Sequence, residues 1–181
     1  MVITSLESER RYYPNDIPFY TKFDEKVLES FVQERWKNPR SQSMSIILDN
    51  CIDPWEKSAS MKTLFLNGRN LRTSLFITMS FAHLKPELRA NIDFIFIARE
   101  KNERDLLKIY EQYGGMFPTF EEFKQVVDQC TKDAFTMLVI DNTSRSDVFC
   151  WFKAEPYPIV TEQILPGRTR SETRMITSLS A

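Results

Sequence analysis

One carboxylate stands where a parallel sheet would present it to a ligand. The stretch SMSIILDNC, residues 43–51, is an apolar run that ends in Asp49 and continues with Asn50. The run predicts a buried strand at 45–48, and an acid directly after a parallel strand lies at the carboxyl edge of the sheet, where open α/β folds bind ligands. In nucleotide hydrolases an aspartate so placed holds Mg²⁺, and a neighbouring acid orients the attacking water. Asn50 can bind a water but cannot accept its proton, and a loop start or helix cap is the competing interpretation of Asp49.

The chain lacks a glycine-rich phosphate loop. Its four glycines are Gly68, Gly114, Gly115 and Gly167, and no G-x-x-x-x-G-K-[ST] motif can be built from them. The backbone N–H groups and the lysine that would cradle the β- and γ-phosphates of a nucleotide are therefore absent from this sequence.

Other catalytic chemistries have less support. His83 is the single histidine, so a Ser-His-Asp or Cys-His arrangement would depend on one residue in a segment that is typical of loop and turn. The three cysteines, Cys51, Cys130 and Cys150, form no C-x-x-C pair. They indicate neither a zinc site nor a disulfide framework.

The composition is that of an ordinary globular domain. The chain has 181 residues, 42% of them apolar and 27% charged, which suits one domain. Its 24 basic and 25 acidic side chains give a net charge near −1, so contact with nucleic acid needs a local patch or a surface built from several subunits. No apolar run approaches about 18 residues and no secretory signal is recognised, so we expect an intracellular protein without a membrane partner.

Strands and helices alternate along the chain. Their apolar patterns predict an open, mostly parallel sheet flanked by helices, with an antiparallel hairpin at its carboxy-terminal end. Helices are expected at 24–36, 57–66, 103–113 and 119–130, with a helical turn at Pro86, and strands at 45–48, 75–80, 92–98, 136–140 and 148–152. The unbroken apolar runs predict strands that are covered on both faces.

The clearest local signal is the start of the fourth helix. Thr119 and Glu122 have the spacing of a capping box, and Phe117 and Phe123 have that of a hydrophobic staple. Asp24 and Asn102 are expected to cap two other helices.

Several stretches together resemble the genome-packaging ATPases of poxviruses and other large nucleocytoplasmic DNA viruses, a branch of the FtsK–HerA group of P-loop motors. The resemblance covers roughly residues 12–155. It is carried by IILDNC at 46–51, FLNGRN and LFITMSF within 65–81, LRANIDFIFIARE at 88–100, YGGMFPTFEEFKQVVDQCT at 113–131, and VIDNTSRSD with VFCWFKAE within 139–155. It implies a RecA/FtsK-like P-loop sheet that is incomplete at its amino-terminal side, with a partial ATPase domain at 1–155. From Pro156 on, Pro, Ser, Thr and Arg dominate the composition, which predicts a flexible tail at 156–181.

The resemblance also assigns residues to a nucleotide site. Asp49 is similar to the Walker B aspartate, which holds the metal ion. Asn50 stands where the family commonly has an acid, and Ser80 where it usually has a glutamine that senses the γ-phosphate. Thr78 matches the family's residue near the nucleotide.

Two arginines complete the implied site. Arg69, in an Asn-Gly-Arg turn, resembles an arginine that acts across a subunit boundary on a neighbour's nucleotide. Arg89 matches a second recurrent arginine. From the residues alone, a solvated surface arginine is the default interpretation of each.

The resemblance implies part of a viral motor that couples ATP hydrolysis to translocation of double-stranded DNA into the capsid, with ATP and Mg²⁺ as cofactors. The implied partners are a homo-oligomeric ring or a separate half carrying Walker A, double-stranded DNA, and capsid components, in the host cytoplasm at the assembly site or in the virion. Because Walker A is absent, hydrolysis by this chain alone stays open. The alternative is a non-hydrolysing structural or assembly subunit derived from the same family.

Overall fold

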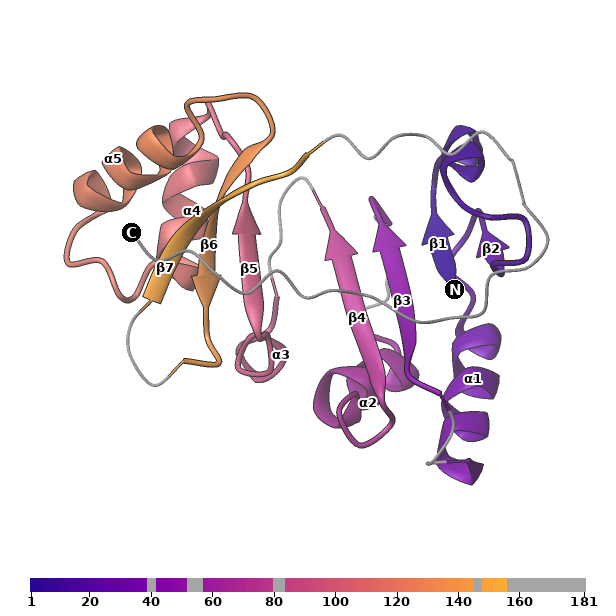
Figure 1. Cartoon of the computed structure of the whole chain (residues 1–181). Helices are drawn as coiled ribbons and strands as arrows, with labels where there is room; N and C mark the ends of the chain where they lie inside the picture. The colour runs from indigo at the N-terminus through magenta and orange to yellow at the C-terminus, as the bar shows by residue number, and fades with distance from the viewer. Residues whose placement is uncertain (39–41, 52–56, 80–83, 145–147, 156–181) are drawn as a thin grey trace.

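The computed structural model describes residues 1–38, 42–51, 57–79, 84–144 and 148–155 of the chain. These residues form two β-sheets with helices packed against them (Figure 1). The predicted class, a mostly parallel sheet flanked by helices with a carboxy-terminal hairpin, is confirmed. The predicted tail at 156–181, Ser80 and His83 lie outside the described residues.

The first sheet contains four parallel strands in the order β2-β1-β3-β4. They are β1 (Val2–Thr4), β2 (Phe19–Tyr20), β3 (Met44–Asp49) and β4 (Thr73–Thr78). Strands of two or three residues carry too little periodicity to be predicted, so β1 and β2 are additions to the expected sheet. β4 begins earlier than expected because Arg72 adopts a left-handed backbone, with φ of 49°, and Thr73 N–H donates to Gly68 O at 2.8 Å, which closes the preceding turn.

The second sheet is antiparallel, in the order β5-β6-β7. It contains β5 (Phe94–Ile97), β6 (Thr136–Asp141) and β7 (Val148–Lys153), and β6 with β7 is the predicted hairpin. β5 is shorter than the predicted 92–98, because Ile92 N–H donates to Arg89 O at 3.1 Å and so belongs to the turn before the strand.

Three of the helices begin where local capping chemistry predicts. The 3₁₀ helix η1 (Glu7–Tyr12) is followed by α1 (Glu25–Lys37), α2 (Ala59–Asn67), α3 (Pro86–Arg89), α4 (Glu103–Tyr113) and α5 (Phe120–Cys130). The side chains of Asp24, Asn102 and Thr119 accept hydrogen bonds from backbone N–H groups in the first turns of α1, α4 and α5, as expected. The Phe117 and Phe123 rings of the predicted staple lie 5.2 Å apart.

We expect Thr119→Ala to lower the free energy of unfolding by about 1 kcal/mol, because the Glu122 N–H that donates to Thr119 Oγ1 at 3.2 Å loses its partner. Urea unfolding of the full chain measures the change. Thr63→Ala is the matched control: Thr63 lies inside α2, where its hydroxyl donates to Ala59 O at 3.0 Å, so alanine should cost little there. Equal losses from the two variants would contradict the cap.

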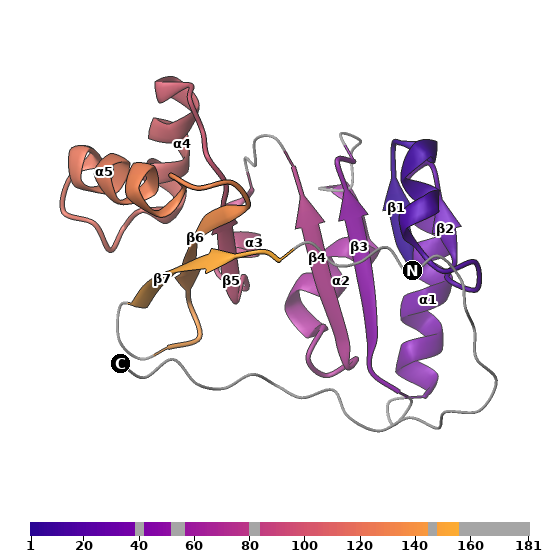
Figure 2. The same cartoon turned by 45° about the horizontal axis from the view of Figure 1, so that its top comes forward.

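Each sheet has its own hydrophobic core. Figures 1 and 2 show α1 and α2 beside the four-stranded sheet and α4 and α5 beside the three-stranded sheet. The first core includes Ile3, Leu28, Val32, Ile46, Leu48, Met61, Leu64, Leu71, Leu84 and Leu88, and the second includes Ile97, Leu106, Phe117, Phe123, Val127, Leu138 and Ile140. Among the described helices none is long and apolar enough to cross a bilayer.

The prediction that the apolar strands are covered on both faces is wrong for β4 and β5. Phe76, Phe94 and Phe96 are 54%, 49% and 54% exposed, whereas their neighbours Leu75 and Ile97 face the two cores. Side chains alternate across a strand, so helices packed on one face cover every second residue. An apolar run shows that both faces are apolar, but it does not show what covers them.

Polar contacts at both ends of α1 join this helix to neighbouring elements of the first sheet and its helices. Arg35 is 4% exposed, and its guanidinium donates to Leu71 O from Nε at 3.0 Å and from Nη2 at 2.6 Å, which ties the end of α1 to the turn before β4. At the other end of α1, Ser60 N–H donates to Glu25 Oε1 at 3.2 Å.

The Glu25 contact makes stability depend on pH. Burial raises the pKa of this carboxyl, but hydrogen bonds from the hydroxyls of Ser58 and Ser60 and from the Ser60 backbone together outweigh burial, so its pKa lies below the ordinary 4.5. Because the folded pKa is the lower one, the contribution is fully present above about pH 4.5 and is lost as the pH falls through the folded pKa. We therefore expect Glu25→Gln to destabilise the chain at pH 7 and to match the unmodified chain in strong acid, measured by urea unfolding from pH 7 to 3. Glu29→Gln, also on α1, controls for the lost charge, and a difference that persists in acid would refute the linkage.

Candidate functional site

A carboxylate and two hydroxyls lie in one row at the carboxyl edge of the first sheet. The strand register pairs Thr4 of β1 with Asp49 of β3, and Asp49 with Thr78 of β4, so the three side chains share a face. Thr78 Oγ1 donates a short hydrogen bond to Asp49 Oδ1, and Thr4 Oγ1 donates to Asp49 Oδ2 at 3.4 Å. Both carboxylate oxygens are therefore held in place by neighbouring strands, as expected of a preorganised ligand group.

Asn50 turns the chain directly after the carboxylate. Its backbone is left-handed, with φ of 48°, a conformation that asparagine tolerates better than most residues. Its N–H lies 3.1 Å from both the backbone oxygen and the hydroxyl of Thr78, and its carbonyl accepts from the Ser5 hydroxyl at 3.2 Å. Asparagine at this position thus has a structural reason that is independent of any role in positioning water.

Tyr13 interacts electrostatically with the Asp49 carboxylate, although it is distant in sequence from β3. Burial raises the pKa of the Tyr13 phenol, and the negative charges of Asp49 and Glu9 raise it further. The phenol therefore stays protonated and can donate a hydrogen bond. The sequence alone did not predict Thr4 or Tyr13 as site residues, because no local pattern links β1 or the segment after η1 to Asp49.

The donor set is the type that magnesium prefers. Mg²⁺ binds oxygen ligands and is commonly held through one or two carboxylates together with waters and substrate phosphates. Asp49 supplies one half-buried carboxylate, and no other described Asp, Glu, His or Cys residues join it in a group of three or more. The site therefore fits a magnesium ion that is held mainly by phosphates and water, and it does not fit an ion enclosed by protein ligands alone.

The two arginines lie away from this edge. Arg69 belongs to the turn before β4, at the opposite end of the strand from Thr78, a separation on the order of 16 Å along the strand. Its guanidinium forms an exposed ion pair with Asp93. Arg89 ends α3, before β5, and its charge lowers the pKa of Tyr113, which burial raises overall. The structure therefore brings Asp49, Asn50 and Thr78 together and places neither arginine with them.

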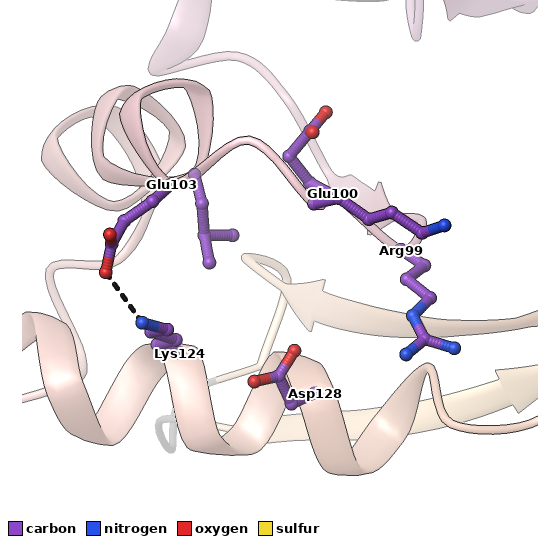
Figure 3. Close-up of a pocket in the computed structure, with 7 residues that line it drawn as sticks. Arg99, Glu100, Glu103, Lys124 and Asp128 are labelled. Atoms are coloured by element: carbon purple, nitrogen blue, oxygen red, sulfur yellow. Dashed lines mark hydrogen bonds and ion pairs between the residues drawn. The ribbon is translucent and has the colours of Figure 1, made fainter.

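A polar depression of about 280 Å³ lies at the carboxyl end of β5, beside α4 and α5 (Figure 3). Its charged lining alternates in sign and consists of Arg99, Glu100, Lys101, Glu103, Lys124 and Asp128. Lys124 Nζ lies 2.6 Å from Glu103 Oε1, and this hydrogen bond lowers the pKa of Glu103 and raises that of Lys124. Because cations and acids balance, the depression has no net charge to attract a phosphate.

The fold places the chain in a structural class. Its fold is shared with viral genome-packaging NTPases. The DNA-packaging ATPase B204 from Sulfolobus Turreted Icosahedral Virus matches with a TM-score of 0.59 at 12% identity, over 84% of this chain and 80% of that one. The genome packaging NTPase B204 from Sulfolobus turreted icosahedral virus 2, solved in complex with AMPPCP, matches with a TM-score of 0.55 at 13% identity, over 83% of this chain and 72% of that one.

The similar sequences are viral proteins. An uncharacterized protein of Invertebrate iridescent virus 3 is 33% identical over 157 residues, which is 80% of this chain and 59% of that protein. Another, of Invertebrate iridescent virus 6, is 30% identical over 157 residues, which is 81% of this chain and 60% of that protein. The chain thus spans about three fifths of the length of these relatives. No family model matches the chain.

Proposed function

We propose that this chain is part of a viral genome-packaging NTPase and supplies the edge of the nucleotide site that carries Asp49. One observation carries the proposal: Asp49 is fixed by Thr4 and Thr78 at the carboxyl edge of a parallel sheet, where folds of this kind bind ligands. Support comes from the shared fold, because the B204 protein was solved in complex with AMPPCP, AMP and ATP-gammaS.

Each residue of the proposed nucleotide site would have its own role. Asp49 would hold Mg²⁺ through water, and the hydroxyls of Thr78 and Thr4 would fix the orientation of that carboxylate. Bound magnesium would neutralise charge on the nucleotide phosphates. Asn50 and Ser80 are proposed to contact the attacking water or the γ-phosphate in place of the family's acid and glutamine.

In this proposal Arg69 and Arg89 would contribute only when several subunits assemble into a ring. Arg69 lies at the far end of β4 from Thr78 and is exposed, so it would reach a nucleotide held by a neighbouring subunit of a ring. An arginine that enters a site from an adjacent chain stabilises the charge of phosphoryl transfer. Arg89 is proposed as a second arginine at the same boundary.

The phosphate cradle would come from a segment outside these 181 residues. The sequence contains no Walker A motif, so a Walker A-bearing half would supply the backbone N–H groups and the lysine. Residues 1–155 would then act as one partial ATPase domain followed by the tail at 156–181. The complete assembly would couple ATP hydrolysis to movement of double-stranded DNA into the capsid, at the viral assembly site or in the virion.

A chimera tests the function. The 157 matched residues of the Invertebrate iridescent virus 3 relative are replaced by their counterparts from this chain, and ATP hydrolysis is measured with and without Mg²⁺ and double-stranded DNA. We expect magnesium-dependent hydrolysis by both the intact relative and the chimera. If the intact relative hydrolyses ATP but the chimera does not, although the chimera is folded and still binds nucleotide, a catalytic role for this chain is refuted.

That second outcome would favour a non-hydrolysing assembly subunit. One observation supports this alternative: the backbone of Asn50 is held in a left-handed turn by Thr78 and Ser5, so the residue serves the turn whether or not it takes part in chemistry. A chimera in which Asn50→Asp restores hydrolysis would then identify this position as the reason for the loss.

A further inference from the structure

The turn that carries Arg69 is held from two sides at the amino end of the first sheet. From α1, the buried guanidinium of Arg35 donates to Leu71 O at 3.0 Å and to Arg72 O at 3.4 Å. From β3, Met44 N–H donates to Arg72 O at 3.0 Å. The backbone of this turn is therefore fixed, and it presents the Arg69 side chain, which is 82% exposed, outward from the sheet.

Large apolar side chains flank this turn. Leu66, in the last turn of α2, is 47% exposed, and Trp36, which follows Arg35 in the last turn of α1, is 52% exposed. Figures 1 and 2 show the ends of α1 and α2 at the same end of the sheet as the start of β4. Tryptophan and arginine are enriched in protein interfaces and contribute much of their binding energy. The surface around Arg69 thus has the composition of an interface.

The opposite end of the same sheet, which carries Asp49, is complementary to this surface. Leu6, directly after β1, is 46% exposed, and Tyr12, at the end of η1, is 51% exposed. The charged residues of η1 and the end of β3 are Glu7, Glu9, Arg10, Arg11 and Asp49, an excess of acid, whereas those in the last turn of α1 and the turn at 68–72 are Glu34, Arg35, Lys37, Arg69 and Arg72, an excess of base. The two ends therefore match in charge, and both expose apolar side chains.

The ion pair of Arg69 is easily exchanged. Its partner Asp93 is 44% exposed, and ion pairs between exposed side chains contribute no more than about 1 kcal/mol. Arg69 can therefore leave Asp93 for a group on another molecule at little cost.

We infer that the amino end of the first sheet, around Arg69, binds the carboxyl edge of the same sheet in a second copy of this chain. Trp36 and Leu66 are the apolar anchors, and they pack against Leu6 and Tyr12 of the second copy. Each copy uses two different surfaces, so the contact is head to tail and can continue to a third copy. This interface rests on the proposed function, because it is the contact that brings Arg69 to the site of Asp49, which lacks both arginines assigned to it.

Sedimentation velocity of the full 181-residue chain without nucleotide tests the interface. We expect association that grows with concentration up to about 100 µM, where even a weak interface is populated. Trp36→Lys and Leu6→Lys should each weaken association at least tenfold. Mixed in equal amounts, these two variants should form a dimer and nothing larger, because one contributes an intact amino end and the other an intact carboxyl edge.

Two further variants guard against loss of structure. Leu66→Lys alters the same anchoring surface on another helix and should behave as Trp36→Lys does. Phe135→Lys is the matched control, because Phe135 is 70% exposed in the turn before β6 of the second sheet and should leave association unchanged. Circular dichroism confirms that each variant is folded.

Three results would overturn this interface. They are a chain that stays monomeric at every concentration, association that Trp36→Lys and Leu6→Lys leave unchanged, and two weakened variants whose mixture does not form the dimer. Because no nucleotide is present, association can fail while the chimera still hydrolyses ATP, and it can persist when the chimera does not.

Discussion

Replacing Asp49 with asparagine should weaken magnesium-dependent nucleotide binding by about 100-fold, equivalent to about 2.7 kcal/mol, in the chimera that carries this chain's residues. Asparagine has the same shape and its amide oxygen can still accept from Thr78, so the fold should persist. The negative charge that holds the metal ion is lost. Isothermal titration with ATP-gammaS, with and without Mg²⁺, measures the change, and binding without metal should be nearly unaffected.

Asp141→Asn is the matched control for this substitution. Asp141 also ends a strand, and its carboxylate also accepts from a neighbouring threonine, since Thr143 Oγ1 lies 2.6 Å from Oδ1. It pairs with Phe94 at the start of β5, however, and so lies at the opposite edge of its sheet. If both variants bind nucleotide equally well, Asp49 does not hold the metal.

The same variant has a readout that requires no nucleotide. The charge of Asp49 is one of the causes that raise the pKa of Tyr13, after burial of the phenol. Asp49→Asn should therefore lower the pKa of Tyr13 toward its ordinary value, which NMR titration of labelled tyrosines detects. An unchanged pKa would show that the phenol and the carboxylate are not neighbours in solution.

Phe123→Ala should cost about 3–5 kcal/mol of unfolding free energy, because it leaves a cavity at the centre of the second core. Phe123 is fully buried, and its ring centroid lies 5.2 Å from that of Phe117 and 5.6 Å from that of Tyr110. A domain of ordinary stability has only about 5–15 kcal/mol in total. Urea unfolding measures the loss, and the midpoint should fall with little change in the slope.

Phe120→Ala on the same helix tests whether burial is the cause. Phe120 is only partly buried, although its ring lies 5.7 Å from that of Tyr110. We expect a clearly smaller loss, because water can occupy the space that the ring leaves. Equal losses from the two variants would mean that the second core is not packed as described.

The local parts of the fold were predictable because their signals are local. A capping residue and the N–H group that it accepts from are two or three residues apart, so Asp24, Asn102 and Thr119 mark the helix starts in the sequence itself. The same holds for the hairpin of β6 and β7 and for the position of Asp49 at the end of an apolar run. The sequence by itself therefore determined the class of the fold, the order of the longer helices and strands, and the strand that presents the carboxylate.

Only the tertiary structure decided what surrounds that carboxylate. Thr4 reaches Asp49 through the pairing of β1 with β3, and Arg69 is separated from Asp49 by the length of β4. The charge of Asp49 also acts on Tyr13, which is distant from it in sequence. The left-handed backbone of Asn50 and the open edges of β4 and β5 likewise depend on which segments lie side by side. Strand register is set by contacts between residues far apart in the chain, and an apolar pattern shows that a face is to be buried without showing against what.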